Sequence, residues 1–114
     1  MSKGIDFTTI NRPTMPLTLR SDPPVALRIK FPTEGQMKGL EQAGIALNKL
    51  AEGENNDLVN ALYTFVAALI SNNRECRTVT VDDLKSKYDV ALEDIILFLN
   101  AYAEFINEVS SSKN

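Results

Sequence analysis

The sequence predicts a mainly α-helical fold of the α+β class, in which a short N-terminal β-hairpin precedes a bundle of about four helices. Two observations carry this prediction. Apolar residues alternate with polar ones between residues 17 and 31, and they recur every three or four residues between residues 37 and 109. The length of 114 residues fits one domain, so we expect a single domain over residues 1–114.

The hairpin is predicted from two short runs of alternating residues. Leu17–Arg20 forms the first run and Val25–Phe31 the second, in which every other side chain is apolar. Period two with one polar face is typical of an antiparallel strand. Ser21–Pro24 lies between the runs and has the composition of a turn. Residues 1–13 show no period and end in Pro13, so they predict a flexible N-terminal arm.

The first helix is predicted to begin after Thr33, which can form a capping box with Gln36, and to end at Gly53. Gly39 and Gly44 interrupt it. Each glycine costs a helix up to about 1 kcal/mol relative to alanine. Two interpretations stay open for them: another backbone approaches closely there, or the helix is simply a weak one.

Three further helices follow in the sequence pattern. A wide apolar stripe over residues 58–70 predicts a core helix. Thr80 and Asp83 have capping-box spacing and predict a short helix that runs to about Lys87. Asp89 is expected to cap the last and strongest helix, which is predicted from Val90 to about Val109 and is followed by a frayed tail over residues 110–114.

The last helix carries the candidate binding residues. Phe98, Tyr102 and Phe105 are spaced by four and three residues, so they are neighbours on one side of the helix. Leu99 and Ile106 lie nearer the centre of the apolar stripe and are expected in the core. Core packing is the favoured interpretation for some of the three aromatic residues. So wide an apolar arc can also bury its excess against a partner chain or a second copy, and both interpretations stay open.

The charge distribution argues against nucleic acid as a partner. The formal net charge is −3, with seven basic and four acidic residues in positions 1–50 and five basic and eleven acidic residues in positions 51–114. Phosphate backbones repel such a chain. The span Thr80–Ile96 has the outline of a helix-turn-helix, but its second helix would open with Glu93 and Asp94, so a plain helical corner is favoured. The asymmetry suits head-to-tail self-association, a basic partner or two solvated faces.

The residue types present exclude most common catalytic chemistry. The chain has no His and a single Cys, Cys76, so it has no His base, no catalytic triad and no internal disulfide. The pairs Asp82-Asp83 and Glu93-Asp94 follow no metal-binding loop and are explained by helix N-termini. We therefore expect no enzymatic activity, no cofactor and no bound metal.

The N-terminal region shows no secretory signal. No apolar run approaches the roughly 18–20 residues that a membrane span needs; the longest run, residues 65–70, has six. The single Cys fits a reducing compartment. We expect a cytoplasmic protein without membrane contact.

Three segments carry a resemblance to a known family. They are Phe65–Ile70, Thr78–Leu84, and Asp94–Leu99 with Phe105–Val109. With the β-rich N-terminal segment before them, they form a pattern of helices and caps over roughly residues 35–110. This order resembles the tail assembly chaperones of long-tailed bacteriophages with Gram-positive and related hosts.

The resemblance implies a function without catalysis. Such chaperones coat the long, helical tape measure protein until tail tube subunits polymerise around it, they self-associate, and in many relatives a translational frameshift appends a second domain. The tape measure protein and further copies of the chain would be the partners, in the cytoplasm of the phage host. Two other classes stay open: a small acidic regulatory or inhibitor module that binds a host protein, and a structural virion subunit.

Overall fold

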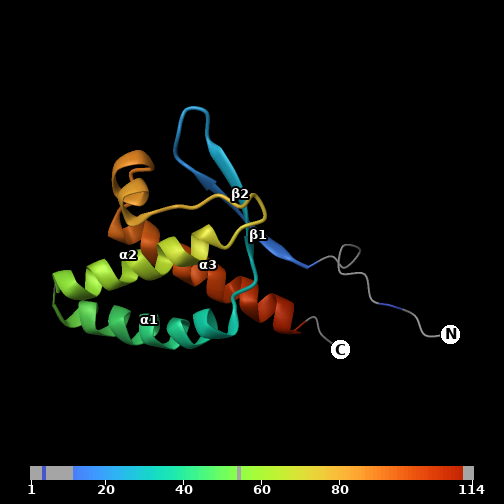
Figure 1. Cartoon of the computed structure of the whole chain (residues 1–114). Coiled ribbons are helices and arrows are strands. Elements are labelled where there is room, and N and C mark those ends of the chain that lie inside the picture. Colours follow the sequence, from blue (N-terminus) through green and yellow to red (C-terminus); the bar gives the residue numbers. More distant parts are fainter. Residues whose placement is uncertain (1–3, 5–11, 54, 112–114) are drawn as a thin grey trace.

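The computed structural model describes residues 4, 12–53 and 55–111. Its elements follow in the order shown in Figure 1. They are β1 (Thr14–Leu19), β2 (Val25–Lys30), α1 (Glu34–Glu52), α2 (Asn56–Ser71), the π-helical turn η2 (Asp83–Lys87) and α3 (Leu92–Ser111). A hairpin followed by four helices is the α+β architecture that the sequence predicts.

The hairpin begins at Thr14, three residues before the predicted strand, and thus includes Pro16. Pro16 pairs with Arg28. The Arg28 N–H donates to the Glu75 carboxylate, and its C=O accepts from the Arg74 N–H, so both Arg28 groups point away from β1. Pro16 therefore lies in a pair that shares no ladder hydrogen bond, and its missing N–H faces the free edge of β1.

The other edge of β2 is covered by the segment after α2. The Lys30 N–H donates to the Asn72 carbonyl at 2.8 Å, and Ile29 forms a bridge with Asn73. The Asn73 side chain is buried, donates to the Ile70 and Arg77 carbonyls at 2.7 and 2.8 Å, and accepts from the Arg77 N–H at 2.9 Å. This buried amide fixes the connection against the hairpin, an arrangement that the sequence pattern did not predict.

The core is centred on α2, which packs against α1, α3 and β2. Figure 1 shows α1 and α2 as an antiparallel pair with α3 crossing beside them. Among the described residues, α1 contributes only Ala43 to the buried set. The largest fully buried apolar side chains come from β2, α2, η2, α3 and the turn that follows η2: Leu27, Ile29, Leu62, Val66, Leu69, Leu84, Tyr88, Ile95 and Tyr102.

The predicted helix ends are confirmed at α1 and before η2. Thr33 and Gln36 form both hydrogen bonds of a capping box, and the Gly53 N–H donates to Leu50. Thr80 and Asp83 also bond reciprocally, with the Thr80 N–H reaching the carboxylate at 3.1 Å and the Asp83 N–H reaching the hydroxyl at 3.0 Å. Local side-chain chemistry therefore determines these two helix starts.

The start of the last helix differs from the prediction. α3 begins at Leu92 rather than Val90, because Asp89 adopts a positive φ of 51° and cannot act as the expected cap. Asp94 replaces it by accepting a hydrogen bond from the Ala91 N–H at 2.9 Å. The helix continues to Ser111, into the predicted frayed tail. Residues 112–114 and most of the predicted arm, residues 1–3 and 5–11, lie outside the described residues.

The close neighbour of Gly39 is a side chain rather than the expected backbone, and Gly44 has no close neighbour. A Cβ atom at Gly39 would lie 2.5 Å from the Phe65 Cε1 atom of α2, so the packing of the two helices requires glycine there. A Cβ atom at Gly44 would meet nothing within 4 Å. Gly44 is therefore only a weak helix residue on an open face of α1.

Candidate functional site

Two apolar grooves flank α3. The first, here called the hairpin groove, lies between β1 and α3 and has a volume of about 420 Å³. The second, here called the helical groove, lies between α1 and α3 and has a volume of about 410 Å³. Concave apolar surfaces of this size are the usual places for a ligand or partner side chain to bind.

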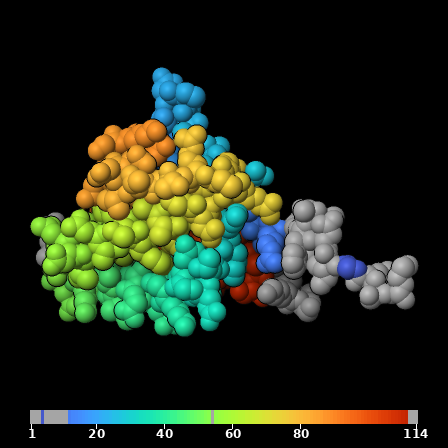
Figure 2. All heavy atoms as spheres, in the orientation of Figure 1, coloured from blue at the N-terminus to red at the C-terminus, as the bar shows by residue number. Residues whose placement is uncertain are grey.

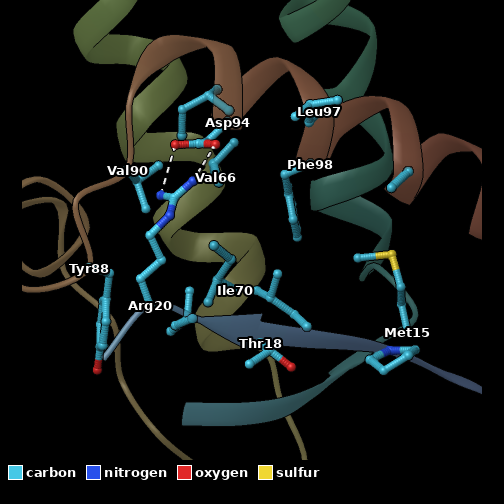
Figure 3. A pocket seen from close by; sticks show the side chains of 15 residues that line it. Met15, Thr18, Arg20, Val66, Ile70, Tyr88, Val90, Asp94, Leu97 and Phe98 are labelled. Carbon is cyan, nitrogen blue, oxygen red and sulfur yellow. Dashed lines mark hydrogen bonds and ion pairs between the residues drawn. The ribbon is translucent and has the colours of Figure 1, made fainter. Parts of the chain in front are cut away.

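The hairpin groove is drawn in Figure 3. Apolar side chains of β1 form one wall and α3 forms the other, with α2 residues at the base. The principal lining residues are Met15, Leu17, Leu19, Val66, Ile70, Ile95, Leu97, Phe98 and Ala101. Leu97 is 65% exposed, which is the largest exposure of a large apolar side chain in the described part of the chain.

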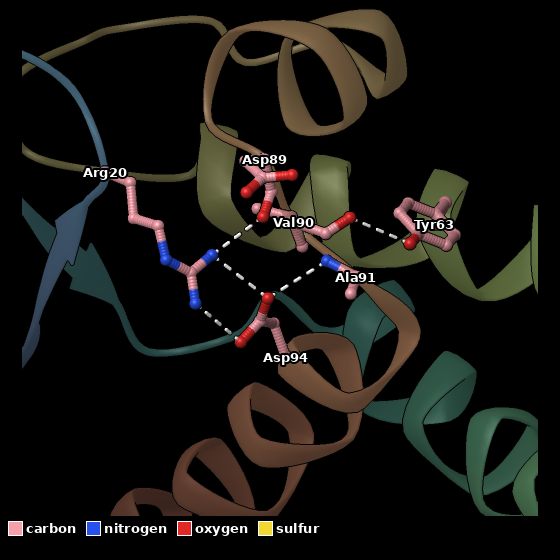
Figure 4. Close-up of polar contacts among 6 residues, drawn as sticks. All are labelled: Arg20, Tyr63, Asp89, Val90, Ala91 and Asp94. Atoms are coloured by element: carbon pink, nitrogen blue, oxygen red, sulfur yellow. Dashed lines mark hydrogen bonds and ion pairs between the residues drawn. The ribbon is translucent and has the colours of Figure 1, made fainter.

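An ion pair closes one end of the hairpin groove (Figures 3 and 4). Arg20 follows β1 directly, and its two terminal nitrogens donate to the two Asp94 carboxylate oxygens at 3.0 Å each. Arg20 Nη1 also donates to the Asp89 carbonyl at 2.8 Å. A guanidinium in a bidentate contact with a carboxylate is held in one orientation. The pair therefore fixes the end of the hairpin to the start of α3.

This contact and its neighbours change the acidity of the carboxylates. The Arg20 hydrogen bond, followed by the Ala91 N–H, holds the pKa of Asp94 below its ordinary value of 3.8. The Arg28 N–H and guanidinium lower the pKa of Glu75 in the same way. Both carboxylates therefore stay ionised and bound to arginine, as in structural ion pairs, and neither has the raised pKa of a general acid.

The helical groove exists because α1 and α3 each pack against α2 and leave apolar side chains facing the space between them. Its lining is mostly aliphatic with a few polar groups. The lining residues are Met37, Leu40, Glu41, Ala43, Gly44, Leu47, Leu99, Asn100, Ala103, Ile106 and Asn107. Gly44 is an exposed lining residue, and Met37 remains 39% exposed.

The aromatic residues predicted as a partner-binding surface lie mostly inside this chain. Tyr102 is fully buried, donates its hydroxyl to the Lys30 carbonyl at 2.7 Å and stacks against Phe98, which is 8% exposed. Phe105 is half-buried and lies edge-on to Phe31, with 6.2 Å between ring centres. The three rings do lie together, but they pack within the chain, where α3 meets α2 and the hairpin region. Leu99 and Ile106 are buried, as expected.

The sequence analysis did not identify the large apolar residues that are exposed on α3 and α1. Leu97 and Ile96 are the exposed large apolar residues of α3, and Met37 and Ile45 are those of α1. A signal existed for Leu97: it lies four residues after Glu93 and seven before Glu104, on the polar side of the helix. An apolar residue among carboxylates is out of place on a solvated face.

The described residues were also compared with the requirements of a metal site and of a membrane-spanning helix. Within residues 4, 12–53 and 55–111, no three His, Cys, Asp or Glu side chains gather as metal ligands would. No helix in the same ranges has both the length and the apolar character to cross a membrane. Cys76 is exposed, with a positive φ of 56°.

Comparison with known proteins adds no relative. The chain matches no protein-family model, no curated protein sequence and no solved structure.

Proposed function

We propose that this chain is a non-enzymatic tail assembly chaperone of a bacteriophage, which holds helical segments of the tape measure protein in the helical groove. The observation that carries the proposal is the groove itself. The two helices line about 410 Å³ of open space with aliphatic side chains. A third helix laid between them would bury those that are still exposed in whole or in part, which are Met37, Leu40 and Leu47 of α1 and Ala103 of α3. An amphipathic helix laid into an apolar groove is a common mode of protein recognition.

The electrostatics of the groove favour a particular kind of helix. Glu41 lines the groove from α1, and the polar residues that line it from α3, Asn100 and Asn107, are uncharged, so the only charge in the lining is negative. A client helix with an apolar stripe and Lys or Arg beside it would fit both the lining and the charge. The pattern of helices and caps that resembles this chaperone family supports the same function, which requires no catalytic chemistry and is therefore compatible with a chain that has no His and a single Cys.

The test is co-expression of the full chain with the tape measure protein encoded next to it. The expected result is that the tape measure protein stays soluble and co-purifies with the chain. Met37→Glu and Leu47→Glu place a charge in the groove and should abolish co-purification. Ile45→Glu is the matched control, because Ile45 is an exposed apolar residue of the same helix, 49% exposed, and does not line the groove.

Each possible result decides between interpretations. If all three variants retain the client, the helical groove is not the binding site. If the wild-type chain does not keep the tape measure protein soluble, the chaperone function itself is wrong. Loss of binding in the two groove variants alone supports the proposal.

A further inference from the structure

The α1 wall of the helical groove has a hole in its row of aliphatic side chains. Leu40, Gly44 and Leu47 all line the groove and are spaced by four and three residues, so they follow one another along one face of α1. The two leucines are half-buried, whereas Gly44 is exposed and has no side chain. The wall is therefore lowest at Gly44, between two longer side chains.

The α3 wall repeats this arrangement. Leu99, Ala103 and Ile106 line the groove at the same spacing of four and three residues. Leu99 is 5% exposed and Ile106 is 9% exposed, but Ala103 between them is exposed and short. Each wall thus has its smallest residue between two large ones. We call the space at Gly44 and Ala103 the central gap.

Nothing within the described part of the chain requires glycine at position 44. A Cβ atom there would meet no atom within 4 Å, whereas a Cβ atom at Gly39 would lie 2.5 Å from Phe65. Glycine is also less favourable than alanine in a helix interior, so the free chain is less stable than it would be with alanine at this position. The missing side chain leaves space in one place, which is the helical groove that Gly44 lines.

The central gap belongs to the outer part of the molecule. In Figures 1 and 2, α1 lies along the lower edge and forms the surface there. We propose that the central gap takes a large apolar side chain of the client helix. Gly44 and Ala103 would then select helical segments that carry such a residue in the middle of their apolar stripe. This inference rests on the proposed function, in which the client lies in the helical groove.

The physical basis of this selection is packing. Helices pack by placing side chains of one helix into the spaces between side chains of another. A client helix with a small residue at the central gap would leave that gap empty, and the atoms that line it would lose contacts. A client helix with a large apolar residue there would fill it. Selection therefore depends on the size of one client residue and on the absence of side-chain atoms at Gly44.

The experiment uses overlapping peptides of about 20 residues, long enough for several helical turns, taken from the tape measure protein encoded next to this chain. Binding of each peptide to the full chain is measured by fluorescence anisotropy. The peptides that bind should share a large apolar residue at the centre of their apolar stripe. Replacing that residue by alanine should weaken binding about tenfold or more, as a loss of several methylene groups from an apolar pocket does.

Variants of the chain test the gap from both walls. Gly44→Ala and Gly44→Leu fill it from α1, and Ala103→Leu fills it from α3. If the groove bound any apolar helix, the added apolar groups would leave binding unchanged or tighten it. If the gap holds a client side chain, Gly44→Ala should weaken binding about tenfold, as one methyl group can in a packed apolar site, and the two leucine variants should weaken it further. Both positions are exposed, so folding should be retained.

A matched control is available on each helix. Gly35 of α1 is exposed, a Cβ atom there would meet nothing within 4 Å, and the residue does not line the groove. Ala101 of α3 is exposed and lines the hairpin groove instead. Gly35→Leu and Ala101→Leu should both bind the peptides as the wild type does. Gly44→Ala should also lose less affinity than the wild type when the client anchor is shortened, because both changes act on the same space.

The possible failures can be told apart. If the wild-type chain binds no peptide and does not keep the tape measure protein soluble, the proposed function is wrong and this inference is wrong with it. If the wild type binds its client and Met37→Glu does not, but Gly44→Leu and Ala103→Leu bind as tightly as the wild type, only this inference is overturned. An equal loss of binding in Gly35→Leu would overturn it too, because added apolar surface rather than the filled gap would then be the cause.

Discussion

Arg20 and Asp94, which lie 74 residues apart in the sequence, join the hairpin to α3 through two hydrogen bonds of 3.0 Å. Asp94 also accepts from the Ala91 N–H, so one carboxylate caps the helix and holds the strand end. A two-stranded hairpin is marginally stable in water by itself and needs a helix to pack against. The ion pair determines which part of α3 meets the end of the hairpin.

The first prediction concerns the pH dependence of this contact. The pKa of Asp94 is lowered in the folded chain, so its contribution to stability is present above its ordinary value of 3.8 and is lost as the pH falls through the lower folded value. Asp94→Asn should therefore lower the melting temperature at neutral pH, and the difference from wild type should shrink below pH 3.8. Circular dichroism melts across this range measure it. A difference that stays constant with pH would show that the charge on Asp94 is not what matters.

The second prediction compares the two glycines of α1. Gly39→Ala places a methyl group 2.5 Å from a Phe65 ring carbon and should destabilise the chain by about 1–3 kcal/mol, as overpacking does. Gly44→Ala meets no atom within 4 Å and should stabilise the chain by up to about 1 kcal/mol. Urea unfolding of both variants measures the free energies. The same sign for both would contradict the packing described for Gly39.

The third prediction concerns the buried Asn73. Asn73→Asp keeps the size of the side chain and the acceptor for the Arg77 N–H, but an ionised carboxylate cannot donate to the Ile70 and Arg77 carbonyls. Leaving buried acceptors unsatisfied costs about 1–3 kcal/mol, and burying the charge adds to this. Urea unfolding at neutral pH should show the loss. Asn72→Asp, at a half-buried neighbour, should cost clearly less.

The parts of the fold that were predictable from the sequence are those that local chemistry determines. The capping pairs Thr33–Gln36 and Thr80–Asp83 are three residues apart, and each forms as its spacing predicts. The alternating residues of β2 place Leu27 and Ile29 in the core, as period two requires. In each case, the residues that decide the structure are close together in the sequence.

The parts that were not predictable depend on contacts between distant residues. Asp94 caps α3 because Asp89, the expected cap, takes a positive φ while its carbonyl binds Arg20. Tyr102 is in the core because the hairpin end offers it the Lys30 carbonyl, 72 residues away. The helical spacing alone could not show which side of α3 would meet α2. The aromatic side could therefore be core or a partner surface from the sequence alone, and the positions of the apolar grooves on either side of it were not predicted.

The last prediction separates the role of Phe105 from that of Ile106, its neighbour on α3. Ile106 is buried, and Ile106→Ala should cost about 2–5 kcal/mol, as for other large-to-small changes in a core. Phe105 is half-buried and contacts the rings of Phe31 and Tyr102, so Phe105→Ala should cost clearly less. Urea unfolding measures both free energies, at a protein concentration where the chain is monomeric.

Binding of a second copy and of the client is then measured for the same variants. If Phe105→Ala weakens either interaction while the chain stays folded, the exposed part of the ring belongs to an interface. If it destabilises the chain as much as Ile106→Ala and leaves both interactions unchanged, Phe105 is only a core residue that anchors the start of α1 to the end of α3.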